Sequence, residues 1–112
     1  MPLTFSKNER LGRREFRRAR WRKLGNSPHF LLFESRNEDS GKRFGVVIQR
    51  KIKGAVVRNR IRRSVKEFFR LNKDLFKNCH DYSVRVVSRP ERIRWDFVSA
   101  ELRALVAGAV KQ

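Results

Sequence analysis

Apolar residues gather in short clusters separated by polar, turn-forming stretches, and the spacing within each cluster predicts its secondary structure. Short apolar or alternating runs predict strands, whereas apolar positions three or four residues apart predict amphipathic helices. Four segments have the strand pattern and two the helical one, whereas residues 13–19, almost entirely basic apart from Phe16, predict a short helix because no proline or β-branched residue interrupts them. In chain order, the prediction is a helix over 13–19, strands over 21–24, 30–33 and 44–48, a helix over 57–73, a strand over 82–87 and a helix over 95–106.

Turn-forming residues separate these segments and suggest how they connect. Residues 25–28 close the first strand, and Gly108 is the expected end of the last helix. The polar stretch 35–42 joins two apolar runs, so an antiparallel hairpin of the second and third strands is the simplest arrangement. Together the segments predict a single α+β domain with an ordered core over about residues 9–107. Its two layers are helices packed on one four-stranded sheet, in the order helix, three strands, helix, strand, helix.

The segment 57–73 has the clearest helical pattern and the most unusual surface. Val57, Ile61, Val65 and Phe68 fall on one face at about 100° per residue, as in a helix packed on a core. The opposite face is almost entirely basic, and only Glu67 interrupts it. Solvated helix faces normally mix both signs, so this bias indicates contact with a nucleic acid. The residues of the basic face are Asn59, Arg62, Arg63, Lys66, Arg70 and Lys73.

The net charge of the chain points the same way. Its 112 residues include 29 lysines and arginines against 11 acids, a formal charge of +18. Self-repulsion on this scale destabilises a small fold unless a polyanion is usually bound. Nucleic acid is the first candidate for that polyanion, an anionic membrane surface the second and an acidic protein the third.

Other features narrow the setting in which the chain acts. No apolar run has the length of a signal-peptide core or a membrane span, so we expect no membrane partner. Cys79 is the single cysteine, which excludes an internal disulfide and favours the reducing cytoplasm. His29 and His80 lack metal-ligand spacing. We expect neither a metal site on the protein nor a small-molecule substrate.

Residues 51–63 contain most of the candidate phosphate-binding residues. Lys51 and Lys53 come from a strand end and a loop, and the following helix brings Arg58, Asn59 and Arg60 near its first turn. A helix start presents free backbone N–H groups to a phosphate, and the planar guanidinium of arginine binds two phosphate oxygens at once. Asn59 fits either a contact with a sugar hydroxyl or a cap on the helix backbone. On composition alone, the segment also fits a solvated helix start.

The same residues resemble a known motif. Arg58-Asn59-Arg60, preceded by Lys51 and the turn 54–56 and followed by 61–63, is similar to the RNR motif of the protein subunit of bacterial ribonuclease P. The resemblance continues in the family's order over residues 10–11, 15–16, 30–33, 44–47 and 81–87, and covers about residues 3–106. The long motif is specific, whereas a bare Arg-Asn-Arg would not be.

The resemblance implies both a fold and a division of labour. The fold is that of ribosomal protein S5 domain 2, with a left-handed strand–helix–strand crossover against the usual right-handed rule. The enzyme removes the 5′ leader of precursor tRNA endonucleolytically and so forms the mature 5′ end. Catalysis lies on a large RNA that binds the Mg²⁺ cofactor, so no catalytic residue is expected on the protein. The protein binds that RNA and holds the leader in a cleft between the first helix, the sheet and the motif helix.

Carried onto this chain, the resemblance assigns residues to two surfaces. Aromatic rings stack on single-stranded bases without demanding a sequence while cations follow the backbone, so these residue types suit a leader cleft. Arg20 stands where the family often has a second aromatic residue, and Gly54 is displaced by one position from the family's glycine. Without the family, Phe16 and Phe33 would fit ordinary core positions. RNA contacts are expected at Lys51, Lys53, Arg58, Asn59, Arg60, Arg62, Arg63 and Lys66, and leader contacts at Phe16, Arg20, Phe33, Ile48 and Arg50.

Other classes of protein share parts of this pattern. A ribosomal or other RNA-scaffold protein has the same size and charge and lacks only the extended motif. A self-sufficient nuclease needs clustered carboxylates to hold metal ions, but the acids here are scattered, and Glu38-Asp39 falls in the predicted 35–42 loop. A sequence-specific DNA binder is the weaker alternative because the sequence has no helix-turn-helix spacing or zinc pattern.

Overall fold

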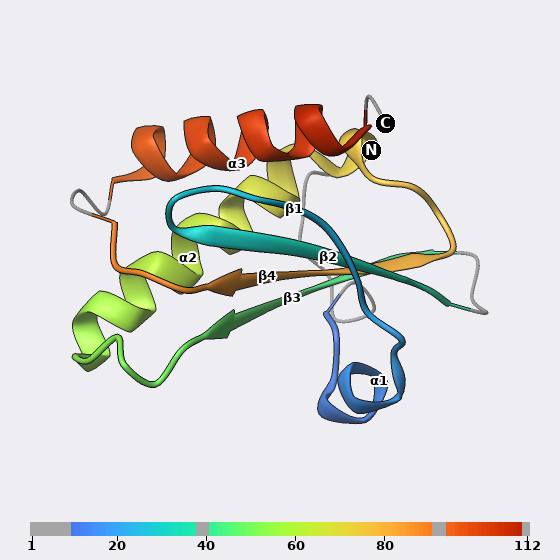
Figure 1. Cartoon of the computed structure of the whole chain (residues 1–112), viewed down its shortest axis with the longest axis horizontal. Coiled ribbons are helices and arrows are strands. Elements are labelled where there is room, and N and C mark those ends of the chain that lie inside the picture. Colours follow the sequence, from blue (N-terminus) through green and yellow to red (C-terminus); the bar gives the residue numbers. More distant parts are fainter. Residues whose placement is uncertain (1–9, 38–40, 91–93, 111–112) are drawn as a thin grey trace.

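The structure is a computed structural model that describes residues 10–37, 41–90 and 94–110. Four strands form one sheet in the order β1-β2-β4-β3. Helices α2 and α3 cover one face of the sheet, and α1 lies across the other (Figure 1). The predicted α+β class and order of elements are confirmed. The elements are α1 (Arg13–Arg18), β1 (Arg22–Asn26), β2 (Phe30–Arg36), β3 (Lys42–Ile48), α2 (Ala55–Leu71), the short 3-10 helix η2 (Lys73–Leu75), β4 (His80–Val86) and α3 (Trp95–Val110).

The predicted hairpin of the second and third strands is wrong. β4 lies between them, antiparallel to β2 and parallel to β3. The backbone just before β4 is bonded to both ends of the connecting loop: the N–H of Asn37 donates to the carbonyl of Cys79, and the N–H of Cys79 donates to the carbonyl of Gly41. The polar stretch therefore reverses the chain around the start of β4, so β2 and β3 are kept apart. Glu38 and Asp39 lie outside the described residues.

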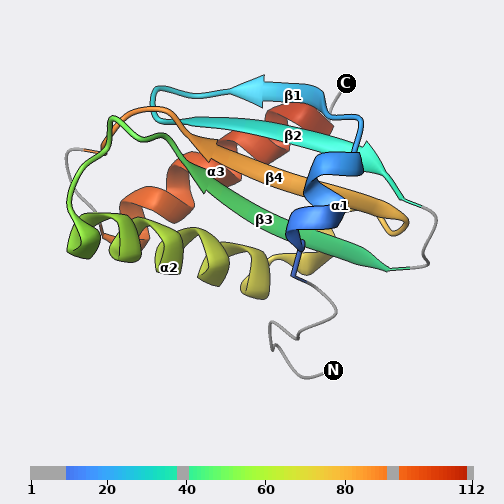
Figure 2. The same ribbon diagram turned by 90° about the horizontal axis from the view of Figure 1, so that it is seen from below.

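Strand β3, helix α2 and strand β4 form a strand–helix–strand unit at the centre of the fold. β3 and β4 are in parallel register from Lys42 opposite His80 to Ile48 opposite Val86. Both strands point the same way, and α2 returns behind them, which makes the crossover left-handed, as the resemblance implies (Figure 2). This unit brings the start of α2 to the end of the sheet where β3 and β4 finish.

One strand and one helix extend past glycines at which the sequence predicted that they would end. β1 continues through Gly25, and α3 continues through Gly108 instead of ending there. Tertiary packing explains both differences. A Cβ at Gly25 would lie only 3.0 Å from Leu105, so this glycine lets the strand approach α3. In α3, burial of Leu102 and Leu105 outweighs the roughly 1 kcal/mol that an interior glycine costs a helix.

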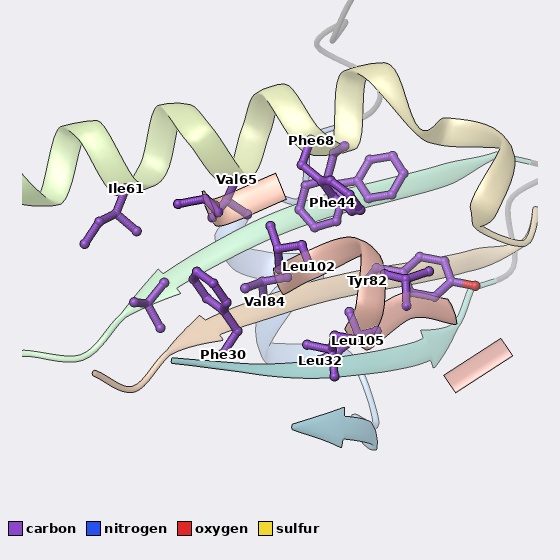
Figure 3. Close-up of a cluster of buried hydrophobic side chains, with 14 of the residues drawn as sticks. Phe30, Leu32, Phe44, Ile61, Val65, Phe68, Tyr82, Val84, Leu102 and Leu105 are labelled. Atoms are coloured by element: carbon purple, nitrogen blue, oxygen red, sulfur yellow. The ribbon is translucent and has the colours of Figure 1, made fainter. Parts of the chain in front are cut away.

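The hydrophobic core lies between the sheet and helices α2 and α3 (Figure 3). Phe44 of β3 stacks on Phe69 of α2 with their ring centroids 4.4 Å apart. Burial of each such side chain contributes about 1.5–3 kcal/mol. The predicted apolar face of the 57–73 segment is confirmed, since Ile61, Val65 and Phe68 are fully buried. Within the described ranges, no helix is long and apolar enough to cross a membrane.

Candidate nucleic-acid interface

The loop between β3 and α2 is anchored to the hydrophobic core by one apolar side chain. Ile52 is 4% exposed and belongs to the core, and its N–H donates to the carbonyl of Gln49 at 3.0 Å. The N–H of Gln49 in turn donates to the carbonyl of Val86, which ties the loop to β4. Lys51 and Lys53, on either side of the buried isoleucine, are both exposed. Anchoring the loop from inside thus presents its two lysines to solvent.

Gly54 sets the angle at which the chain enters α2. Its φ is +96°, in the region that favours glycine, and it occupies the N-cap position without a side-chain cap bond. The carbonyl of Gly54 accepts the N–H of Arg58 at 3.0 Å, the first bond of the helix. The glycine's place in this chain is therefore required by the turn that precedes the helix.

Arg58, the first residue of the Arg-Asn-Arg motif, folds back on the loop. Its guanidinium donates to the carbonyl oxygens of Ile52 at 3.0 Å, Gln49 at 3.2 Å and Ile48 at 3.4 Å. The residue is half-buried, and its hydrogen-bonding capacity is largely used within the protein. Arg58 therefore positions the loop, a role that the sequence did not indicate.

The remaining motif residues form the basic surface of α2. Arg60, Arg63 and Lys66 are exposed along the helix, and they continue the charge of the two loop lysines. Asn59 does not cap the helix: its Oδ1 accepts a hydrogen bond from Nη1 of Arg62 at 3.2 Å. This contact holds a second guanidinium on the same surface. We call Lys51, Lys53, Asn59, Arg60, Arg62, Arg63 and Lys66 the motif surface.

The single acid on this helix is compensated by a cation one turn away. Nε of Arg70 donates to Oε2 of Glu67 at 3.1 Å, and a second guanidinium nitrogen contacts the other carboxylate oxygen. The hydrogen bond from Arg70 lowers the pKa of Glu67 and raises that of Arg70. Since Glu67 is ionised and paired, it does little to reduce the positive charge of the helix as a whole.

A second surface lies on the face of the sheet that α2 and α3 leave uncovered. Strand side chains alternate between the faces, and the register places Lys23, Leu31, Phe33, Val47 and Arg85 on this side, the open face. Phe33 is half-buried and lies outside the core cluster, so the core interpretation of this residue is excluded. The guanidinium carbon of Arg85 lies 5.8 Å from the centre of the Phe33 ring, and Lys23 is its cross-strand neighbour. The face thus presents an aromatic ring between cations.

Helix α1 borders the open face at the far end from the motif. Leu11 N–H donates to the carbonyl of Phe44, and a Cβ at Gly45 would meet the Leu11 side chain at 3.2 Å, so glycine permits this close approach. The ring of Phe16 packs on Trp21 with centroids 5.2 Å apart, outside the core cluster. Arg20 follows the helix, exposed at the same border.

Not every residue predicted for the leader cleft lies on this side. Phe16, Arg20 and Phe33 do, and Arg50 is exposed in the loop that follows β3. The assignment of Ile48 is wrong, because its side chain is 6% exposed and lies in the core on the opposite face. Val47, its neighbour, takes the position on the open face. Sequence reasoning missed Arg85 and Lys23, although the alternation of Tyr82–Val87 places Arg85 opposite the buried valines.

The carboxylates of the described residues are mostly engaged with cations. Asp81 accepts two bonds from Arg43 at 2.9 and 3.0 Å, and Glu34 one from Arg22 at 2.8 Å. Glu101, a residue of α3, contacts Nδ1 of His29 at 2.7 Å. In the part of the chain that the structure describes, no three acids, histidines or cysteines come together as metal ligands.

The architecture so described is that of a small α+β protein with a basic helix beside an open sheet face. A family model described as Ribonuclease P matches residues 5–110 of the chain. The ribonuclease P protein component of Geotalea uraniireducens is 37% identical over 104 residues, 89% of each chain. That of Syntrophus aciditrophicus is 35% identical over 106 residues, 93% of this chain and 89% of the relative.

Solved structures agree with these relatives. The RNase P protein of Thermotoga maritima matches with a TM-score of 0.69 and 27% identity, over 88% of this chain and 96% of that one. An RNase P protein of Staphylococcus aureus, 21% identical, shares the fold with a TM-score of 0.73, over 86% and 89% of the two chains. The chain therefore belongs to the ribonuclease P protein family, which acts in tRNA processing.

Proposed function

We propose that the chain is the protein subunit of a bacterial-type ribonuclease P, acting in the cytoplasm with a catalytic RNA on precursor tRNA. The observation that carries the proposal is the adjacency of two surfaces suited to different forms of RNA. The loop over residues 49–54 separates them: the motif surface begins on it, and Val47 and Arg85 of the open face lie just before it. One small protein can therefore touch two RNA molecules at once.

The motif surface suits a folded RNA. Its cations are mounted on a rigid helix and on a loop anchored by Ile52 and Arg58, so their spacing is fixed before binding. Lysine and arginine contacts to phosphates release counterions and supply affinity without reading sequence. In this proposal the partner of the motif surface is the RNA subunit.

The open face suits a single strand. Bases stack on an exposed ring such as Phe33 for roughly 1–3 kcal/mol each, whatever their identity. Arg85 and Lys23 flank that ring and are placed to follow the phosphate backbone. A subunit that binds many different leaders needs this tolerance. In this proposal the open face binds the 5′ leader of precursor tRNA.

The chemistry of endonucleolytic hydrolysis is assigned to the RNA. Mg²⁺ prefers carboxylate oxygens and water, and the acids described here do not form a shared ligand set. Instead Asp81, Glu34 and Glu67 each lie against an arginine, which competes for the oxygens that a cation would need. The described residues therefore do not fit a catalytic magnesium site, and in this proposal their part is to bind and orient RNA.

Cleavage of precursor tRNA at low Mg²⁺ tests the proposal. A bacterial ribonuclease P RNA is assayed with the protein, without it, and with the protein alone. The proposal expects strong stimulation by the protein and no cleavage when the RNA is omitted. Folded protein that binds RNA without stimulating cleavage would instead identify an RNA-scaffold protein. Cleavage by the protein alone would overturn the assignment of the chemistry to the RNA.

A further inference from the structure

A basic hollow lies beyond the open face, between the end of α1 and the end of β2. It has a volume of about 360 Å³ and is lined by Arg18, Ala19, Arg20, Ser35 and Arg36. All three arginines are exposed, and none forms an ion pair with a residue that the structure describes. No carboxylate lines this hollow. Three arginines and no acid thus line this hollow.

The floor of the hollow carries a hydroxyl group that can still donate. Ser35 is 5% exposed, and its Oγ accepts the N–H of Arg20 at 3.1 Å. That bond uses the oxygen as an acceptor, and no described residue accepts the hydroxyl proton. A hydroxyl donor in a hollow lined by arginines is complementary to an anion with several oxygens. Phosphate has that chemistry.

A neighbouring hollow contains the acids nearest to this one. It has a volume of about 420 Å³, shares Arg18, Ser35 and Arg36 with the first, and adds Glu15, Asp81 and Arg43. Arg43 lies between the two acids, bonded to Asp81 and 3.6 Å from Glu15. Arg43 offsets one of these two negative charges, and with Arg18 and Arg36 the neighbouring hollow has three arginines against two acids, so its net charge stays positive.

We propose that this hollow, the Arg18–Arg36 pocket, binds a phosphate of the precursor-tRNA leader beyond the nucleotide stacked at Phe33. The inference rests on the proposed function and extends the leader's path. Ser35 and Phe33 point to the same side of β2 two residues apart, a separation of roughly 7 Å along the strand. A strand of RNA that crosses Phe33 toward α1 is therefore led to the arginines. The pocket adds affinity only for leaders long enough to reach it.

The test measures the affinity of the holoenzyme for precursor tRNAs whose leaders are lengthened one nucleotide at a time. The variants are Arg36→Gln and the double variant Arg18→Gln/Arg36→Gln. Arg103→Gln, on the exposed side of α3, is the control for the loss of one positive charge. With wild-type protein we expect affinity to rise in a step when the leader reaches the pocket. The double variant should lose that step, about tenfold, and keep the affinity for shorter leaders.

Three results would overturn the inference, and each is distinguishable from failure of the proposed function. One is a leader-length curve of the double variant that matches wild type and Arg103→Gln. Another is an equal loss of affinity at every leader length. The third is weaker binding of the RNA subunit alone, which would assign the phosphate to that RNA. If wild-type protein gave no gain from any leader, the proposed function itself would fail. Thermal unfolding of each variant confirms that the fold is intact.

Discussion

The guanidinium of Arg58 donates to the carbonyl oxygen of Ile52 at 3.0 Å, so the motif's first arginine holds the loop that carries the lysines. Arg60, two residues later, is exposed on the motif surface. From the sequence, both arginines were expected to contact RNA near the start of the helix. The structure gives them different roles, and the difference can be measured.

Replacing Arg58 by alanine should lower the free energy of unfolding by about 2 kcal/mol, because three loop carbonyls lose a charged donor. Arg60→Ala should change it by less than about 0.5 kcal/mol, as for other surface positions. For Arg60→Ala the slope of log K against log salt should instead fall by about one unit. Urea unfolding and RNA binding at several salt concentrations check both. A stable Arg58→Ala protein with a lower salt slope would restore the original expectation.

Gly54→Ala should destabilise the protein by about 1–2 kcal/mol, because φ is +96° at this position and a Cβ makes that conformation costly. Gly41→Ala is the control, since a Cβ there meets nothing within 4 Å and φ lies outside the left-handed region. Urea unfolding compares the two variants. Equal stability would show that the loop relaxes to another conformation without cost.

Phe33→Leu should weaken holoenzyme binding of leader-bearing precursor tRNA by about tenfold, because an aliphatic side chain does not stack on a base. Phe33→Tyr keeps a ring and should keep most of the affinity. Mature tRNA lacks the leader, so both variants should bind it like wild type. A loss for mature tRNA in Phe33→Leu would place this residue outside the leader path.

Glu101 should make the stability of the protein depend on acid pH. Burial raises its pKa, but the hydrogen bonds from Ser27 and from the ring and backbone of His29 outweigh it, and the net shift is downward from 4.5. The folded state therefore favours the carboxylate: its stabilisation is complete above about pH 4.5 and is lost as the pH falls through the lowered pKa.

Glu101→Gln should consequently be less stable than wild type by about 1 kcal/mol at neutral pH, a figure reduced for partial exposure, with a smaller difference below the lowered pKa. Asp96→Asn, an exposed acid on the same helix, is the control and should follow the wild-type curve. Thermal unfolding between pH 2 and pH 7 measures all three proteins. Parallel curves for Glu101→Gln and wild type would remove the carboxylate from the acid response.

Local sequence signals sufficed for the elements but not for their pairing. The periodicity of residues 57–73 located α2 because one buried face and one basic face repeat at the helical spacing. The polar stretch before β3 showed only that the chain reverses. Whether β2 pairs with β3 or with β4 depends on contacts between residues more than forty positions apart in the sequence, such as Leu32 opposite Val84. Such contacts leave no local pattern.

The lack of a local sequence signal also explains where the predicted site residues and the structure differ. In β3 the run from Phe44 to Ile48 is apolar on both faces apart from Gly45, so alternation could not tell which residues face the core, and a one-residue error exchanges the faces. Ile48 was assigned to the leader cleft from the resemblance, and this apolar run gave no local signal against the assignment. The role of Arg58 in holding the loop left no sequence signal either, because a cation that binds backbone carbonyls looks, in sequence, like one that binds phosphate.

The central position of β4 has a consequence for synthesis of the protein on the ribosome. The last strand to be translated is the one that both β2 and β3 need as a neighbour. Until residues 80–86 have left the ribosomal exit tunnel, the sheet cannot close, and most of the basic residues are already outside on an unfolded chain. The sheet therefore folds late in synthesis, and a nascent chain that binds RNA before that point does so without its sheet.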